Sequence, residues 1–280
     1  MKTAVVTDST AYLPKELREK LNIYMIPLSV VFDHETYKEE VEITTEDFYE
    51  KMRNAKDLPT TTQPSTGEFV ELFEKLSKDY DAVISIHLSS GISGTLQGAA
   101  TAGTMVENIK VYPYDSEISC RVQGFYVIEA AKMALEGKEP EEIIARLDEM
   151  KKSIRAYFIV DDLTNLQKGG RLSGAAALIG GLLQVKPVLH FVDKVIVPFE
   201  KIRTKKKAMN RIVELLGEAV SDEAEYQAVV IHGNREEEAI AWKKEMEAKF
   251  PNVEFDISYF GPVIGTHLGE GAMGLGWVKK

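Results

Sequence analysis

Three polar segments, far apart in the chain, carry residue types that hold anions. The first, residues 89–95, contains four hydroxyl side chains and two glycines in seven positions. It follows the apolar residues 82–88 and leads into a small-residue segment of helical character, so the free N–H groups of a helix start would face the same point as the hydroxyls. An N-cap turn alone would need only one of these side chains. The segment therefore favours a site for a carboxylate or a phosphate.

The second and third segments each have a structural and a functional interpretation. Residues 60–66 begin with three consecutive threonines, and Ser65 forms a capping box with Glu68, which explains the serine but not the threonines. Residues 261–271 contain His267 among four glycines. A histidine serves as a partner for an anion near neutral pH or as an ordinary loop donor. Both segments are candidates for the same anion site, and a purely structural role stays open for each.

A serine hydrolase or acyltransferase is the alternative function. Residues 91–95 resemble the G-x-S-x-G pattern of a nucleophile elbow, although a threonine stands where the pattern has its closing glycine. Such an enzyme would use Ser93 as the nucleophile and His267 as the base. Asp8 or Asp115, each after an apolar run, would supply the acid.

Neither a cofactor nor a metal ion is expected. Residues 269–274 spell G-x-G-x-x-G, but too few residues follow them for a βαβ unit, so the match does not predict a dinucleotide site. The phosphate-binding pattern G-x-x-x-x-G-K-[ST] is absent from the sequence. The five histidines show no metal-ligand spacing.

The composition excludes several classes of protein. Lys and Arg number 34 against 44 Asp and Glu among 280 residues, a formal charge of −10, which disfavours a general nucleic-acid binder because the field of the whole molecule repels phosphate. The single cysteine, Cys120, allows no internal disulfide and predicts a reducing compartment, so we expect a cytoplasmic protein. We expect no signal peptide, because the apolar run in the first residues is short, and no membrane span at residues 175–183, which fall short of the roughly 20 apolar residues that a span needs.

One basic run stands out in this acidic chain. Residues 201–207 contain five cations at the expected start of a helix, where the helix dipole disfavours positive charge. The run is either a solvated helix start or a docking surface for an acidic partner or a phosphate. Residues 168–171, with a lysine and an arginine around two glycines, could join that surface.

The elements that position these segments are those of an α/β protein. Short β-branched runs alternate with longer segments of helical period, which predicts mostly parallel strands joined by crossover helices. Charge density rises at residues 151–153 before a new apolar strand begins, so we place the domains at 1–154 and 155–280. The small apolar residues 175–183 form either plain core or the flank of a narrow tunnel.

The polar segments also carry a family resemblance. The sequence resembles the DegV family of bacterial fatty-acid-binding proteins, which include the acyl-carrying subunits of fatty acid kinase. The resemblance implies an N-terminal Rossmann-like parallel sheet with flanking helices and a C-terminal α/β domain, with the lipid between the domains. Six motifs occur in the family's order, at residues 6–10, 61–65, 89–95, 161–173, 186–187 and 261–267.

The resemblance implies a lipid-binding protein rather than an independent enzyme. By motif position Thr61, Ser93 and His267 would hold the carboxylate of a long-chain fatty acid, with Gly94 beside them. The tail would lie in a tunnel between the domains. Lipid exchange would involve transient membrane contact without a transmembrane segment.

The resemblance further implies a protein partner. Arg171 and Arg203 correspond to the residues with which family members dock the catalytic subunit of fatty acid kinase. Family members commonly carry a proline where this chain has Glu270. The extra carboxylate would raise the pKa of His267 or change access to the tunnel.

Overall fold

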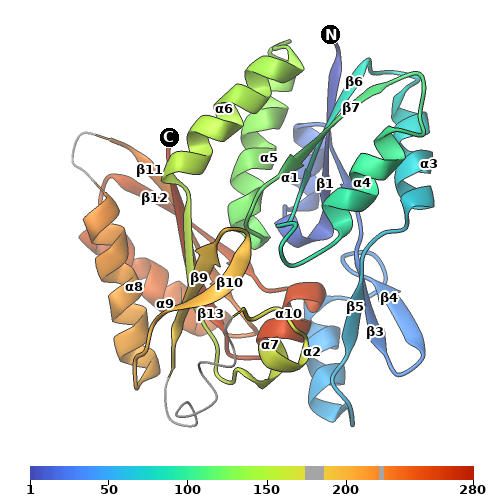
Figure 1. Cartoon of the computed structure of the whole chain (residues 1–280). Helices are drawn as coiled ribbons and strands as arrows, with labels where there is room; N and C mark the ends of the chain where they lie inside the picture. The colour runs from blue at the N-terminus through green and yellow to red at the C-terminus, as the bar shows by residue number, and fades with distance from the viewer. Residues whose placement is uncertain (174–185, 221–223) are drawn as a thin grey trace.

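The computed structural model describes residues 1–173, 186–220 and 224–280 (Figure 1). The apolar stripe 175–183, considered above as a tunnel flank, lies outside the described residues. Within the described ranges, no helix has both the length and the apolar run that crossing a bilayer requires.

The first sheet is four-stranded and wholly parallel, in the order β2-β1-β6-β7. Its strands are β1 (Thr3–Asp8), β2 (Ile23–Ile26), β6 (Ala82–His87) and β7 (Lys110–Asp115). Its helices are α1 (Lys15–Lys20), α3 (Thr66–Leu76), α4 (Thr95–Gly103), α5 (Cys120–Leu135) and α6 (Pro140–Ser153), and the short helix η1 (Ser9–Ala11) follows β1. One face packs against α3 and α4, and the other packs against α5 and α6. The predicted Rossmann-like parallel sheet is confirmed.

The second sheet has six strands in the order β10-β9-β8-β13-β11-β12. These are β8 (Arg155–Ile159), β9 (Val188–Val192), β10 (Val195–Glu200), β11 (Tyr226–His232), β12 (Val253–Tyr259) and β13 (Met273–Lys279). Only β11 and β12 pair in parallel, so the expectation of mostly parallel strands is wrong for this half. One cause is the turn at Asp193 and Lys194, whose positive φ angles make a tight hairpin of β9 and β10.

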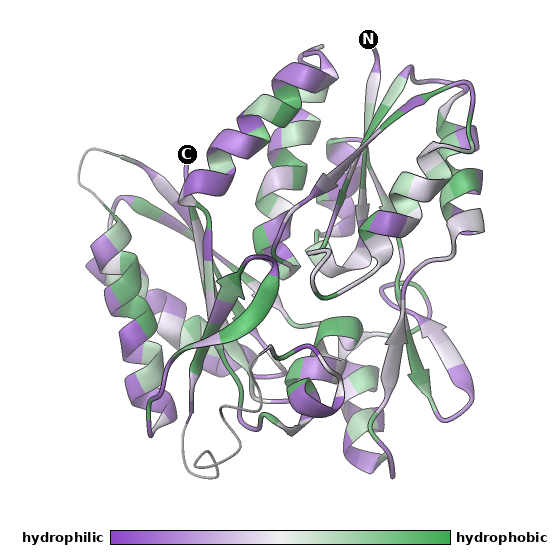
Figure 2. Cartoon of the chain, in the orientation of Figure 1, coloured by the Kyte–Doolittle hydropathy of each residue, from purple (hydrophilic) through white to green (hydrophobic). Residues whose placement is uncertain are grey.

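Helices separate the two sheets. α5 and α6 contact strands of both sheets, so they form a shared middle layer (Figure 1). The outer face of the second sheet is covered by α8 (Lys205–Ala219) and α9 (Glu236–Lys249). Hydrophobic residues follow this layering, on the strands and on the helix faces turned toward them (Figure 2). The division into domains 1–154 and 155–280, here called the N-terminal and C-terminal halves, stays a prediction because one continuous core crosses it.

A small antiparallel sheet completes the N-terminal half, in the order β4-β3-β5. Its strands are β3 (Ser29–Phe32), β4 (Glu35–Lys38) and β5 (Thr60–Thr62), and α2 (Thr45–Asn54) packs beside it. From the C-terminal half, α10 (Pro262–Leu268) packs against β3, β5, α2 and α7 (Thr164–Lys168). This junction brings the polar segment 261–271 next to residues 60–66.

The capping signals in the sequence are confirmed. Ser65 and Glu68 form the capping box of α3. The side chain of Thr204 caps α8, so the basic run does lie at a helix start. These caps fix where the segments around them change direction.

Candidate functional site

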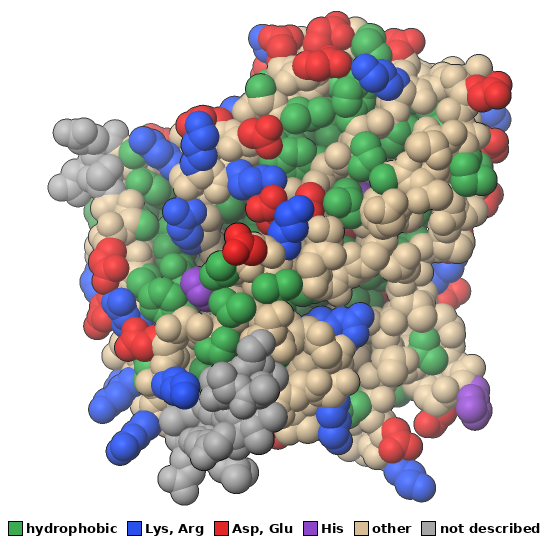
Figure 3. Space-filling model, viewed as in Figure 1, with side chains coloured by type: hydrophobic (Ala, Val, Ile, Leu, Met, Phe, Trp, Pro, Cys, Tyr) green, Lys and Arg blue, Asp and Glu red, His purple; other side chains and the backbone are tan. Residues whose placement is uncertain are grey.

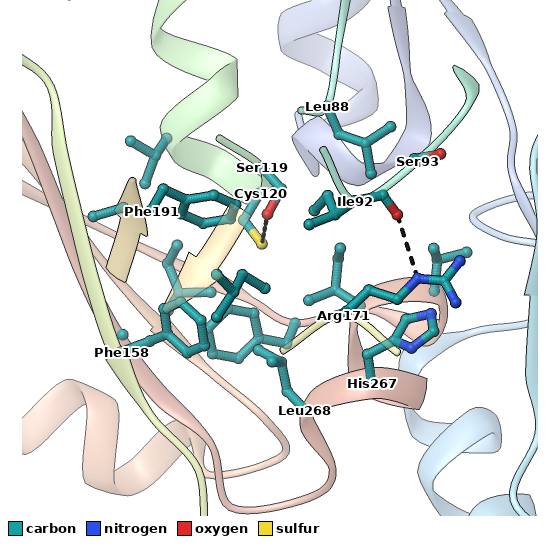
Figure 4. Close-up of a pocket in the computed structure, with 18 of the residues that line it drawn as sticks. Leu88, Ile92, Ser93, Ser119, Cys120, Phe158, Arg171, Phe191, His267 and Leu268 are labelled. Atoms are coloured by element: carbon teal, nitrogen blue, oxygen red, sulfur yellow. Dashed lines mark hydrogen bonds between the residues drawn. The ribbon is translucent and has the colours of Figure 1, made fainter. Parts of the chain in front are cut away.

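A cavity lies between the second sheet and the loops of the N-terminal half. It holds about 900 Å³ of empty space, mouth included, and most of its lining is apolar. Phe158 and Phe191 lie toward one end, Arg171 and His267 lie together at the other, and Leu268 lies between them (Figure 4). The cavity therefore has an apolar end and a polar end, as a molecule with an alkyl tail and a charged head would require.

The polar end is assembled from the segments singled out in the sequence. Thr61 lies on β5 and His267 on α10, and Thr61 Oγ1 and His267 Nε2 form a hydrogen bond of 2.9 Å. Ser93 and Gly94 line the same cavity at the start of α4. Gly94 is exposed to solvent, so the polar end of the cavity lies beside the opening of the cavity.

His267 is held as a neutral ring. Burial, with a further contribution from the charge of Arg171, lowers its pKa to about 4. Its Nδ1 is buried and has no hydrogen-bond partner among the described residues. That nitrogen faces the backbone of Gly169, where a Cβ would lie 2.5 Å from it, so a side chain at position 169 would displace the ring.

Arg171 lies in the cavity lining beside His267. Its Nε donates to the carbonyl of Ile92 at 3.3 Å, and its Nη1 donates to the carbonyl of Gly169 (Figure 4). The sequence singled out this arginine for docking and did not predict a place in the cavity. Its guanidinium brings a permanent positive charge to the polar end.

The two loops that carry Thr61 and Ser93 touch each other. A Cβ on Gly94 would lie 2.3 Å from the side-chain oxygen of Gln63, so a side chain at position 94 would require that of Gln63 to move. Ser93 Oγ pairs with Thr95 Oγ1 at 2.8 Å. The hydroxyl of Ser93 thus lies at the cavity without a bond to His267.

The groups of the hydrolase alternative have other partners. Nε2 of His267 bonds to Thr61 rather than to Ser93. Asp8 bonds to Nδ1 of His87 at 3.0 Å, and Asp115 pairs with Lys194 at 3.0 Å. The structure does not assemble the nucleophile, base and acid of a triad around Ser93.

Asp8 instead belongs to a buried hydrogen-bonded chain that sequence reasoning missed. His87 bonds to Asp8 through Nδ1 and to Ser85 Oγ through Nε2 at 2.7 Å, and all three side chains are 0% exposed. Burial would raise the pKa of Asp8, but hydrogen bonds from His87, Thr10 and the N–H of Leu88 outweigh it and hold the pKa below its usual value. The chain joins β1 to β6 and reaches no solvent, which suits a structural role.

Glu270 pairs with groups other than His267. Its carboxylate accepts from Asn234 at 3.0 Å and from Arg235 at 2.8 Å, and it pairs with Arg53 at 3.1 Å. Burial alone would raise the pKa of Glu270, but the hydrogen bonds from Arg235 and Asn234 and the charges of Arg53 and Arg235 lower it overall. The expectation that Glu270 raises the pKa of His267 is wrong, since that pKa is lowered, and an effect of Glu270 on access to the tunnel stays a prediction.

Arg203 lies apart from the cavity lining, exposed just before α8. Of its basic neighbours, Lys205 pairs with Glu238 at 2.8 Å, whereas Lys206 and Lys207 are exposed. Lys and Arg side chains gather over the start of α8, at the lower left of the space-filling view (Figure 3). The described residues hold no cluster of His, Cys, Asp and Glu suited to a metal ion.

Comparison with known proteins identifies the family. The family model described as "Uncharacterised protein, DegV family" matches residues 2–280. The chain belongs to the DegV family. Protein DegV of Bacillus subtilis is 62% identical over 281 residues, with 100% of both chains covered. A DegV domain-containing protein of Listeria innocua is 57% identical over 280 residues, covering 100% of this chain and 99% of its own.

Solved structures of DegV proteins share the whole fold. The crystal structure described as DegV, a fatty acid binding protein from Bacillus subtilis, superposes with a TM-score of 0.96 at 62% identity, over 100% of both chains. A DegV family protein from Thermus thermophilus, described by its fatty acid binding, gives 0.94 at 30% identity, again over 100% of both chains. The expected DegV-like α/β fold is confirmed, and four of the six motifs that suggested the family line the cavity.

Proposed function

We propose that this DegV protein binds a long-chain fatty acid in the cavity, with the carboxylate at the polar end. The observation that carries the proposal is the one-sided lining, in which Thr61, Arg171 and His267 gather with Ser93 at one end and most of the other lining side chains are apolar. The names of the Bacillus subtilis and Thermus thermophilus structures, both given as fatty acid binding, support it.

The energetics favour such a ligand. Each methylene taken out of water contributes about 0.8 kcal/mol, so an alkyl tail is a large source of affinity, partly offset by the ordering of the chain. A buried carboxylate without partners would cost much of that gain. The hydroxyls of Thr61 and Ser93 and the backbone N–H of Gly94 are the donors that we assign to it. The neutral ring of His267 has one N–H, which we assign to Nε2 as a donor to Thr61 Oγ1, so that the hydroxyl of Thr61 is free to donate to the carboxylate. Arg171 supplies the balancing charge, because His267 is neutral at pH 7.

We further propose that the protein acts as a carrier and not as an enzyme. The carboxylate would lie near the exposed Gly94, where a fatty acid kinase subunit could reach it. The exposed Arg203 is the candidate docking residue for that partner. We retain a cytoplasmic location, on the single buried cysteine, and transient membrane contact during lipid exchange.

The binding proposal is tested by extracting the purified protein with organic solvent and identifying co-purified acyl chains by mass spectrometry. Thr61→Ala, Ser93→Ala and His267→Ala should each weaken binding of hexadecanoic acid by about 1.5–3 kcal/mol, the range for hydrogen bonds to a charged group. Because these side chains share one ligand group, their effects should be non-additive. Thr60→Ala, on the exposed neighbour of Thr61, is the matched control. Purified protein that contains no acyl chain, and that binds none when hexadecanoic acid is added, would rule the proposal out.

The docking proposal needs a separate assay. Arg203→Glu should leave the affinity for hexadecanoic acid within a few tenths of a kcal/mol while reducing acyl-phosphate formation by a kinase partner, because rim charges act mainly on encounter. Loss of both activities would place Arg203 in the ligand site. Loss of neither would leave the basic run as a solvated helix start.

A further inference from the structure

Glu39 is a buried carboxylate outside the cavity lining. It follows β4, its side chain is 0% exposed, and it accepts three hydrogen bonds from two separate parts of the chain. Ser9 donates to Oε2 at 2.6 Å, Tyr12 donates to Oε1 at 2.8 Å, and the backbone N–H of Val263 donates to Oε1 at 2.7 Å. A buried carboxylate is costly unless its oxygens are satisfied, so these bonds hold it in one place.

The bond to Val263 ties Glu39 to the helix that carries His267. Val263 lies in the first turn of α10, and His267 follows it four residues later, about one helical turn along. Gly261 allows the start of α10 to lie close to Tyr12 and Glu39, because a Cβ at this position would lie 2.4 Å from the ring of Tyr12 and 3.1 Å from Oε1 of Glu39. A carboxylate of the N-terminal half therefore holds the start of a helix from the C-terminal half.

Glu39 also accounts for Ser9 in the segment at residues 6–10, which the sequence singled out but which does not line the cavity. The hydroxyl of Ser9 donates to Glu39 and accepts from the backbone N–H of Leu28 at 3.0 Å. The N–H of Glu39 in turn donates to the carbonyl of Leu28 at 2.9 Å. Leu28 lines the cavity, so one network fixes both the cavity wall and the start of α10.

We propose that Glu39 is a positioning residue for the polar end of the cavity. By fixing the start of α10 on the N-terminal half, it sets where His267 stands opposite Thr61. Hydrogen bonds weaken steeply with distance and angle, so a small shift of α10 would break the 2.9 Å contact between these two side chains and misplace a donor to the bound carboxylate. The inference rests on the proposed function.

The test is a double-mutant cycle with hexadecanoic acid as the probe. Glu39→Ala should weaken binding about tenfold in the wild-type background but less than about twofold in the His267→Ala background, because Glu39 acts through that ring. Glu39→Gln should stay within about threefold of wild type, since its amide oxygen still accepts from Val263. Tyr259→Phe removes a bond to the adjacent Glu40 across the same junction and is the matched control, with no change in affinity expected.

Two outcomes would overturn the inference. Equal losses in both backgrounds would mean that Glu39 stabilises the fold without acting on His267, and an unchanged affinity in Glu39→Ala would mean that α10 needs no such anchor. If Glu39→Ala does not fold, Tyr12→Phe replaces it in the same cycle, since it removes one donor to Glu39 and the acceptor for the N–H of Ile264. A wild-type protein that binds no acyl chain would instead contradict the proposed function before any variant is compared.

Discussion

Arg171 brings a permanent charge to a cavity whose histidine is neutral at pH 7. If it balances the fatty acid carboxylate, Arg171→Gln should weaken binding of hexadecanoic acid by about 1.5–3 kcal/mol, the range for a hydrogen bond to a charged group. The affinity of Arg171→Lys should lie between those of the wild type and Arg171→Gln, because lysine keeps the charge but lacks the planar guanidinium that reaches Ile92. Isothermal titration calorimetry would measure the affinities of the wild type and the two variants for hexadecanoic acid.

The matched control for Arg171 is Arg203→Gln, which removes an exposed arginine outside the cavity lining. Its affinity should equal that of the wild type. Equal affinities for Arg171→Gln and the wild type would contradict the charge-balancing role and leave docking as the remaining interpretation of Arg171.

Two buried titratable residues should give opposite pH dependences of stability. Burial lowers the pKa of His267 to about 4 and raises that of Glu39 to about 7. Between about pH 4 and 6.5 the unfolded histidine binds a proton that the folded one does not, so its contribution to stability grows as pH rises. Between about pH 4.5 and 7 folded Glu39 keeps a proton that the unfolded residue releases, so its contribution falls as pH rises.

These two contributions should nearly cancel in the wild type between about pH 4.5 and 6.5. Glu39→Gln keeps only the histidine contribution, so its free energy of unfolding should rise with pH, by about 1.4 kcal/mol per pH unit relative to the wild type. His267→Gln keeps only the Glu39 contribution, so its free energy of unfolding should fall by a similar amount per pH unit relative to the wild type. Urea unfolding at several pH values would measure both. Parallel pH profiles for the three proteins would show that neither group titrates differently in the folded state.

At the scale of elements, the hairpin of β9 and β10 closes one side of the cavity. Phe191 and Ile196 of this hairpin line the cavity, and its turn rests on the loop at residues 89–95. Ser89 donates to the carbonyl of Lys194 at 2.6 Å, and a Cβ on Gly91 would lie 2.4 Å from that same carbonyl oxygen. The hairpin is therefore fixed at its tip by backbone contact with the other half.

Gly91→Ala should displace the hairpin tip and loosen the cavity wall. We expect the release rate of a bound fluorescent fatty acid, measured by stopped flow, to rise severalfold. Gly67→Ala is the matched control, because its new Cβ would meet only Ser65 Oγ at 3.9 Å, an ordinary contact. Release rates that are the same in the two variants would show that the tip contact does not control the cavity.

Local signals in the sequence predicted elements better than their pairing. The capping box of Ser65 and Glu68 and the strand predicted from the apolar residues 82–88 are both signals that depend only on neighbouring residues. The capping box and β6 appear where they were expected. The antiparallel pairs of β13 with β8 and β11 join segments far apart in the chain, so no local period could reveal them. Arg171 was predicted as important but not as a cavity residue, and Glu39 gave no signal, because its donors come from distant backbone and side chains.

At the scale of the whole molecule, the two sheets share α5 and α6 as a middle layer. The cavity lies where this layer, the second sheet and α10 meet, so neither half builds it alone: Val122 comes from α5, Leu275 from β13 and Val263 from α10. Its polar end depends on the junction between the halves, whereas its apolar end depends mainly on the second sheet. Head-group recognition and tail selection are thus separable by mutation.

The apolar end of the cavity is closed by a thin wall. Ala156, Tyr157 and Phe191 line the cavity and also line an outer depression that includes Ile154 and His190. Ala156 is the smallest side chain in this wall. A larger residue there should shorten the space for the tail, because packed interiors accommodate extra methylene groups only at a cost of about 1–3 kcal/mol.

Ala156→Leu should therefore lose affinity for the longest acids that the wild type binds while keeping its affinity for shorter ones. A series of saturated acids of increasing length, each measured by calorimetry, would reveal the shift. Ala241→Leu makes the same change on the exposed face of α9 and should leave the length profile as it is in the wild type. A uniform loss at every length would point to general damage, and an unchanged profile would place the tail elsewhere, because a wall residue acts only on chains long enough to reach it.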